Sequence, residues 1–224
     1  MRLFGLAANQ SSMHFGQIIQ ELSIFLLPLL LGITLHEVAH GYVAYLLGDP
    51  TAKKAGRLTL NPLKHLDPLG LMVLLITRKI GWAKPVPINP AYFKNLKKGL
   101  LLVSIAGPGA NFILAICFWL LLKLVTWLNP NPYSWLTIYF FKPLYLISSA
   151  GVIVNIILGV FNLIPIPPLD GSKILAYFLP EKWTYTYLSW EKYGFIVLIL
   201  FLFTGLFNKF LNIVLNFIYF YILG

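Results

Sequence analysis

The sequence predicts an all-α polytopic membrane protein with about four to six transmembrane helices. Of its 224 residues, 58% are hydrophobic and only 11% are charged. Several apolar runs are long enough to cross the hydrocarbon core of a bilayer, which a soluble domain of this length would not contain. Tyr, Phe and Trp make up 16% of the residues, which suits anchoring at the membrane interface.

The basic residues are distributed unevenly. Ten of the seventeen fall between Lys53 and Lys98, in the connection after the first apolar run. A net charge of +10 would suggest a nucleic-acid partner in a soluble protein, but the positive-inside rule explains this cluster better. We therefore expect no nucleic-acid partner and a multi-pass protein of the cell membrane, with the 53–98 connection in the cytoplasm. The 129–142 connection carries only Lys142 and is expected outside.

The first apolar segment, Leu22–Leu47, contains His-Glu-Val-Ala-His at positions 36–40. As a helix it would be roughly 39 Å long, with His40 about 10 Å and His36 about 16 Å from its end at Leu47. Ionisable groups at such depth are costly and indicate function. Histidines at i and i+4 share one helix face, and the pattern H-E-x-x-H binds zinc through both histidines, with the glutamate as general base.

The connection after this span is rich in turn-forming residues. Arg57–Leu60 alternates polar and apolar residues, as in a short strand. The apolar run Leu69–Ile76 is too short to span and is expected to be a re-entrant or interfacial piece. Prolines in segment 81–90 exclude a helix interior but allow an edge strand. Short membrane-associated β-strands and a re-entrant loop are therefore expected near the active site.

Two more long spans are expected at Gly99–Leu128 and Leu144–Leu163. The small residues at 106–111 in the first of these would let helices approach closely. The other runs into segment 162–171, where three prolines in four positions forbid regular helix. Non-helical backbone at membrane depth must be buried in protein or line a wet cavity, so Asp170 is expected at a cavity.

The C-terminal part is expected to add a fourth span at Tyr187–Phe207, while Phe210–Leu223 is short for a fifth. No internal repeat is evident. Residues 1–224 are therefore expected to form a single transmembrane domain, with a core at about 17–180 and peripheral C-terminal helices at about 187–223.

Two histidines make an incomplete catalytic zinc site, because such zinc usually takes three protein ligands and a water. A carboxylate from another helix is needed. Of the seven acids, only Asp170 follows a proline-broken segment at the inner end of a span, close to the depth of the histidines. The alternative is that Asp170 caps the helix that begins there.

H-E-x-x-H at 36–40 and N-x-x-P-x-P-x-x-D-G at 162–171, in this order on separate spans, resemble the site-2 protease family of intramembrane zinc metalloproteases. Segments 61–70, 81–87 and 106–111 also look like its compact prokaryotic branch, without the PDZ or CBS domains of other members. The resemblance covers about residues 30–175. It implies one zinc ion, with the following roles: ligands His36, His40 and Asp170, and catalytic base Glu37.

The resemblance also implies the substrate: transmembrane proteins or peptides, cut within or next to their membrane segments. A transmembrane helix hides its peptide bonds in its own hydrogen bonds, so it must be unwound to be cut. An extended strip could accept the unwound chain by strand addition, and segments 162–168 and 57–60 are candidates. Asn162 and Asn111 could bind the freed substrate backbone, or could form interhelical hydrogen bonds instead. His65 could stabilise an oxyanion, but His-x-Asp-Pro is also a good turn.

Two alternatives remain on the sequence alone. One is a divalent-metal transporter with a transit site of histidines and carboxylates, and the other is an inactive protease homologue. Glu37 favours the protease, because a transporter has no evident need for a base beside two ligands. Transporters also often have repeated halves with paired half-helices, which are not found here. The oligomeric state is left open.

Overall fold

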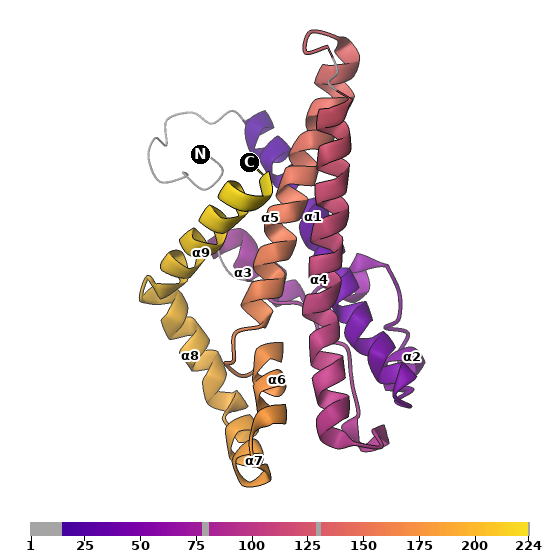
Figure 1. Cartoon of the computed structure of the whole chain (residues 1–224), viewed down its shortest axis with the longest axis vertical. Helices are drawn as coiled ribbons and strands as arrows, with labels where there is room; N and C mark the ends of the chain where they lie inside the picture. Colours follow the sequence, from indigo (N-terminus) through magenta and orange to yellow (C-terminus); the bar gives the residue numbers. More distant parts are fainter. Residues whose placement is uncertain (1–14, 78–80, 129–130, 224) are drawn as a thin grey trace.

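The computed structural model describes residues 15–77, 81–128 and 131–223, and its regular structure is helical (Figure 1). Within these residues, four segments are long and apolar enough to cross a membrane, so the chain is a multi-pass membrane protein. The segments are Ser23–Leu46, Leu96–Trp127, Thr137–Asn162 and Leu206–Leu223. The first three segments confirm the expected spans. Their ends agree with the expected ones to within three residues, except that the third segment begins seven residues earlier than expected.

The long helices are α1 (Phe15–Leu46), α4 (Leu96–Trp127) and α5 (Lys142–Asn162), the last continuous with the π-turn η3 (Thr137–Phe141). Shorter elements connect and follow them. They are α2 (Thr51–Lys54), η1 (Pro62–Lys64), α3 (Pro68–Thr77), η2 (Pro90–Tyr92), α6 (Asp170–Phe178), α7 (Glu181–Ser189), α8 (Glu191–Phe203), α9 (Leu206–Phe217) and η4 (Ile218–Leu223).

Helix α4 is the centre of the bundle. It packs against α5, α1 and α6, and Figure 1 shows α4 and α5 side by side along the long axis, with α1 crossing them. An apolar core joins α4, α5 and the C-terminal α9–η4 segment, and a smaller one joins α1 to α4. The buried members of the larger core are Phe118, Val152, Ile153, Val214 and Ile218. Helix α1, which carries the two histidines, packs against both α4 and α5.

The expected fourth span at Tyr187–Phe207 is wrong. The helix is interrupted at Trp190, and α8 ends at Phe203 after 13 residues. The chain then turns at Gly205, and α9 continues into the π-turn η4 to form the fourth candidate span instead. The sequence Ser-Trp-Glu-Lys at 189–192 puts two charges where the helix breaks, which explains why one long span does not form.

Short β-strands are not found in the described residues. Segment 57–60 is irregular, and the Arg57 guanidinium donates a hydrogen bond to the Lys84 carbonyl at 2.7 Å. The strand-like contact present is an isolated antiparallel bridge between Leu66 and Ala83. Because Pro85 and Pro87 have no N–H, that bridge cannot extend into a ladder.

Helix α3 has ten residues, about 15 Å, and is too short to span, as expected for the 69–76 run. Two of the basic residues used to predict orientation, Arg78 and Lys79, lie outside the described residues.

Candidate metal centre

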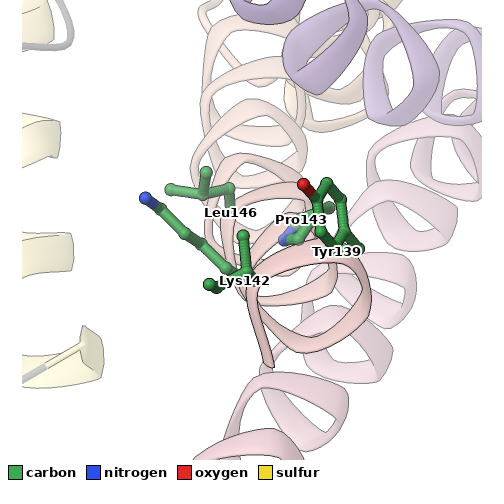
Figure 2. A pocket seen from close by; sticks show the side chains of 5 residues that line it. Tyr139, Lys142, Pro143 and Leu146 are labelled. Atoms are coloured by element: carbon green, nitrogen blue, oxygen red, sulfur yellow. The ribbon is translucent and has the colours of Figure 1, made fainter. Parts of the chain in front are cut away.

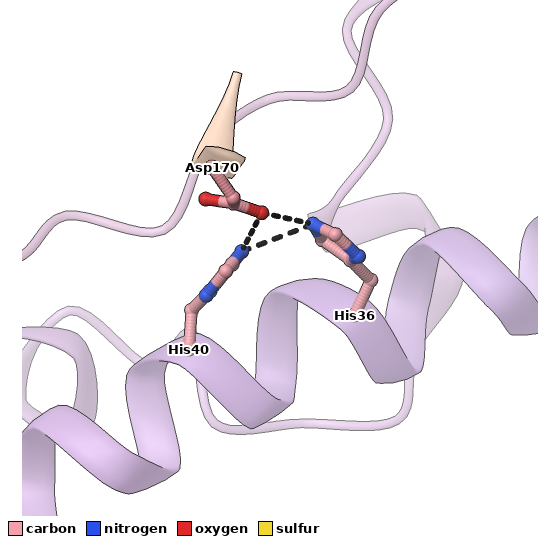
Figure 3. Close-up of side chains that lie close together, drawn as sticks. All are labelled: His36, His40 and Asp170. Atoms are coloured by element: carbon pink, nitrogen blue, oxygen red, sulfur yellow. Dashed lines mark hydrogen bonds and ion pairs between the residues drawn. The ribbon is translucent and has the colours of Figure 1, made fainter. Parts of the chain in front are cut away.

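Three side chains from distant parts of the chain converge on one point (Figure 3). His36 and His40 lie one turn apart on α1, and Asp170 is the first residue of α6. The two Nε2 atoms are 3.0 Å apart and lie 3.2 and 3.1 Å from Asp170 Oδ2. All three residues are buried. Within the described ranges, this is the group of donor side chains that could hold a metal ion.

The outer nitrogen of each imidazole has its own partner. His40 Nδ1 donates to the Val103 carbonyl at 2.7 Å, and His36 Nδ1 donates to Asn111 Oδ1 at 2.6 Å. A carbonyl oxygen only accepts, so the proton of each ring lies on Nδ1. Both Nε2 atoms therefore present lone pairs to Asp170, which is the arrangement found in metal-binding histidines.

The convergence of these donors fits a zinc ion. Asp170 Oδ2 is buried and has no hydrogen-bond partner, so three electron-rich atoms face one another without a proton between them. Zinc–nitrogen bonds of about 2.0–2.1 Å in a tetrahedral site separate neighbouring donors by roughly 3.3 Å. The spacing of 3.0 to 3.2 Å is close to this value. Two imidazoles and one carboxylate are also a ligand set of catalytic zinc.

Asp170 does not cap the helix that it begins. The N-cap of α6 is Leu169 and Asp170 is the first residue inside the helix, so the alternative prediction for this residue is wrong. Segment 163–169 turns back from the end of α5, and a Cβ added to Gly171 would lie 2.2 Å from the Leu163 carbonyl oxygen. The glycine after Asp170 therefore allows the close approach that brings the carboxylate over the histidines.

A second glycine, Gly107 on α4, makes room for the imidazoles. A Cβ at this position would lie 2.4 Å from His40 Nε2 and 2.6 Å from His36 Cε1. The small residues at 106–111 were interpreted as a site of close helix packing. The structure shows that Gly107 also forms the wall behind the two histidines.

Glu37 lies next to the histidines in a cavity of about 180 Å³. Its Oε2 accepts a hydrogen bond of 2.8 Å from the backbone N–H of Val86, which holds the proline strip 85–87 at the cavity. Lys173, three residues after Asp170 on α6, also lines the cavity. The sequence analysis missed Lys173, although its i, i+3 spacing from Asp170 places it on the same helix face.

The three residues predicted to support the substrate lie in different places. Asn162 lines the cavity, and its Nδ2 donates to the Leu158 carbonyl. Asn111 is fully buried on α4, where it contacts the Nδ1 side of His36. His65 is also fully buried, does not line the cavity, and donates from Nε2 to the Thr59 carbonyl at 2.8 Å. Of the three, the structure thus brings only Asn162 to the cavity beside Glu37.

A hollow of about 260 Å³ lies at the start of α5 (Figure 2). Its lining contains one charged residue, Lys142, and no histidine or acid. The lining residues are Ile138, Tyr139, Lys142, Pro143 and Leu146. The lining of this hollow therefore offers no metal ligand and no acid or base for hydrolysis.

Comparisons with known proteins agree with this geometry. The model of peptidase family M50 matches residues 136–205, which include Asp170. YwhC of Bacillus subtilis is 42% identical over 181 residues, which are 80% of this chain and 80% of YwhC. Rip2 of Mycolicibacterium smegmatis is 31% identical over 188 residues, 80% of this chain and 66% of Rip2.

A third relative, MJ0392 of Methanocaldococcus jannaschii, is 28% identical over 163 residues, 73% of this chain and 36% of the relative. The names of all three relatives assign them to the zinc metalloproteases. No solved structure matches the chain.

Proposed function

Since this chain belongs to peptidase family M50 and is a zinc metalloprotease of the membrane, we propose that its substrates are transmembrane proteins or peptides, cut within or next to their membrane segments. The observation that carries the proposal is the convergence of His36, His40 and Asp170 beside Glu37 at one cavity. The cavity adjoins the non-helical segments 85–88 and 163–169, which can face an unwound chain.

We propose that His36, His40 and Asp170 hold one zinc ion per chain. Zinc held there supplies a Lewis acid that polarises the scissile carbonyl and lowers the pKa of a water molecule. The histidines contribute Nε2 lone pairs, fixed by the bonds at Nδ1, and Asp170 contributes a buried negative charge. Two observations support these roles: the chain belongs to a zinc metalloprotease family, and the three side chains present atoms that can donate electron pairs to zinc.

Glu37 is the proposed general base. Water adds to the carbonyl carbon, its proton passes to the Glu37 carboxylate, and Glu37 delivers that proton to the amine nitrogen as the C–N bond breaks. The Val86 N–H binds Oε2 and holds the carboxylate in place, which leaves the other oxygen to accept the proton.

Two further side chains are proposed to face the developing negative charge of the carbonyl oxygen. Asn162 and Lys173 line the same cavity as Glu37. Preorganised donors and cations at such a position stabilise the transition state. In this role they replace His65, which does not line the cavity. Asn111, which was expected to bind the substrate backbone, donates its amide N–H groups to the Gly32 carbonyl and to Asn155 Oδ1 instead.

The unwound substrate is proposed to lie along the proline segments 85–88 and 163–168, because Pro85, Val86, Ile88 and Pro168 line the cavity and neither segment is helical. Segment 57–60, the other candidate, forms no strand. The active site is proposed to face the cytoplasmic side of the cell membrane. Exposed lysines gather near the same end of α1 and α4, namely Lys53, Lys54, Lys64, Lys84, Lys94 and Lys98.

The same bundle supports a single transmembrane domain over the whole chain, because α1, α4, α5 and α6 pack on one another. The α7–α9 region is proposed to be peripheral to it. Only 11% of the residues in the most apolar stretch of Leu206–Leu223 are buried, against 33% for Ser23–Leu46.

The test is cleavage of a panel of single-span substrates by purified protein in detergent. Wild type is compared with a chelated sample, a sample given zinc back, and Asp170→Asn. Glu181→Gln, an exposed acid on α7, is the matched control. We expect cleavage that chelation abolishes and zinc restores, with loss of both zinc and cleavage in Asp170→Asn alone.

The same preparations in liposomes decide between this function and its rivals. Wild type that carries zinc across the liposome membrane without cutting any substrate is a transporter. Wild type that binds zinc and does neither is an inactive homologue. Either result ends the protease proposal for this chain.

A further inference from the structure

Asn155 is an amide buried in the middle of α5, a membrane-spanning helix, and is 0% exposed. Its Nδ2 donates to the carbonyl of Gly151 at 2.9 Å, and its Oδ1 accepts from Nδ2 of Asn111 at 3.1 Å. The sequence analysis assigned no role to it, because an isolated asparagine in an apolar helix has no motif around it.

Asn111 connects Asn155 to the metal centre by hydrogen bonds. Its Nδ2 donates both to Asn155 Oδ1 and to the Gly32 carbonyl, each at 3.1 Å, and its Oδ1 faces His36 Nδ1 at 2.6 Å. Backbone carbonyls only accept, so the partners Gly32 and Gly151 determine which end of each amide is the nitrogen. A chain of hydrogen bonds therefore runs from α5 through α4 to His36 on α1.

We propose that Asn155 is a positioning residue of the metal centre, which holds the Asn111 amide so that its oxygen faces His36. The inference rests on the proposed role of His36 as a zinc ligand. If the side-chain amide of Asn111 rotated by about 180°, so that its nitrogen and oxygen exchanged places, its nitrogen would donate to His36 Nδ1. That contact favours the tautomer with the proton on Nε2, which has no lone pair for a metal.

The competing explanation is that Asn155 only joins α5 to α4. Interhelical amide hydrogen bonds in membranes do stabilise helix association. The two roles differ in what they predict. A helix-joining role predicts lower stability with unchanged metal affinity in the folded protein, whereas a positioning role predicts weaker metal binding in protein that is still folded.

The experiment compares Asn155→Leu with wild type by zinc affinity, measured by competition with a chromophoric chelator, and by the visible absorption of the cobalt-substituted protein. Ser148→Ala is the matched control. Ser148 is also fully buried on α5, and its hydroxyl has no hydrogen-bond partner. We expect zinc to bind about 10–100-fold more weakly to Asn155→Leu, with an altered cobalt spectrum, and no change in Ser148→Ala.

Asn155→Asp supplies the rescue. A neutral carboxyl group can accept from Asn111 and donate to the Gly151 carbonyl, as the amide does, so it should restore most of the zinc affinity. The proposal is overturned if folded Asn155→Leu binds zinc with wild-type affinity and spectrum, or if Asn155→Asp is as weak as Asn155→Leu. If Asn155→Leu does not fold, the zinc affinity and cobalt spectrum of Asn155→Ala are compared with those of wild type instead, and the same two results overturn the proposal. Wild type that binds no zinc overturns the proposed function as well, and this result is distinct from the others.

Discussion

The backbone N–H of Val86 donates a hydrogen bond of 2.8 Å to Glu37 Oε2, although the two residues are 49 positions apart in the chain. One carboxylate thus has two tasks. It holds the strip 85–87 at the cavity, and beside the histidine pair it is the proposed general base. A substitution that keeps the hydrogen bond to Val86 but cannot accept a proton therefore tests the base role without disturbing the structure.

Glu37→Gln is that substitution. The glutamine oxygen can still accept from Val86, so the strip should stay in place, but an amide cannot take the proton of water. We expect cleavage to fall by at least about 10²-fold, within the 10²–10⁴-fold range of general-base catalysis, with zinc content equal to that of wild type. Initial cleavage rates and metal analysis of the same preparation measure both. Cleavage near the wild-type rate would mean that another group is the base.

Gly107→Ala should damage the metal centre without touching a ligand. The added methyl group would lie 2.4 Å from His40 Nε2 and 2.5 Å from its Cε1, so the ring must move. We expect zinc affinity at least about 10-fold weaker, as for changes around a metal shell. Gly109→Ala is the control on the same helix, since its Cβ meets nothing within 4 Å. Equal zinc binding by the two variants would show that Gly107 does not enclose the imidazoles.

The metal centre could be predicted from the sequence because its signals are local. His36 and His40 lie one turn apart on one helix, where spacing alone places them on a common face, and Glu37 is adjacent to His36 in the sequence. Asp170 was identified through the prolines before it, which exclude helix and require a protein-lined cavity. The structure brings these residues together as the motifs suggested.

The remaining parts depend on contacts between distant segments. Asn155 matters only through Asn111 on another helix, and no periodicity indicates such a pair. The interruption between α7 and α8 at Trp190 escaped prediction because hydropathy measures the length of an apolar run and not whether the helix breaks within it. Segment 57–60 has the pattern of a strand, but among the described residues no neighbouring segment forms a β-ladder with it.

Asp49, just after the end of α1, predicts a pH dependence of stability. Its buried carboxylate accepts from the backbone N–H groups of Thr51 at 2.9 Å and Asn89 at 2.7 Å, and from the Thr51 hydroxyl. Burial alone would raise the pKa of Asp49, but these hydrogen bonds outweigh it and hold the pKa below its usual value. The carboxylate therefore stabilises the fold at pH values above the pKa of the unfolded chain, and this contribution is lost as the pH falls through the lower folded pKa.

We expect Asp49→Asn to unfold at a lower temperature than wild type at pH 7. The amide nitrogen would face an N–H donor, at a cost of about 1–3 kcal/mol. As the pH falls below about 4, wild type loses its advantage and the two melting temperatures should converge. Thermal unfolding in detergent between pH 7 and pH 3 measures this difference. A gap that stays constant over that range would show that the charge of Asp49 is not what stabilises the fold.

Lys173 supplies the last prediction, because it is the cationic side chain that lines the cavity and no ion pair with an acid is found for it among the described residues. Lys173→Met keeps most of the apolar stem but removes the charge that we propose to face the carbonyl oxygen. Loss of one such group costs roughly 10²-fold in kcat. We expect that loss at unchanged zinc content, partial recovery in Lys173→Arg, and no effect of Lys182→Met, an exposed lysine on α7. Single-turnover cleavage at saturating substrate isolates the chemical step. If Lys173→Met and Lys182→Met cut at the same rate, the charge of Lys173 takes no part in the transition state, and Asn162 is left as the cavity residue with an amide to donate.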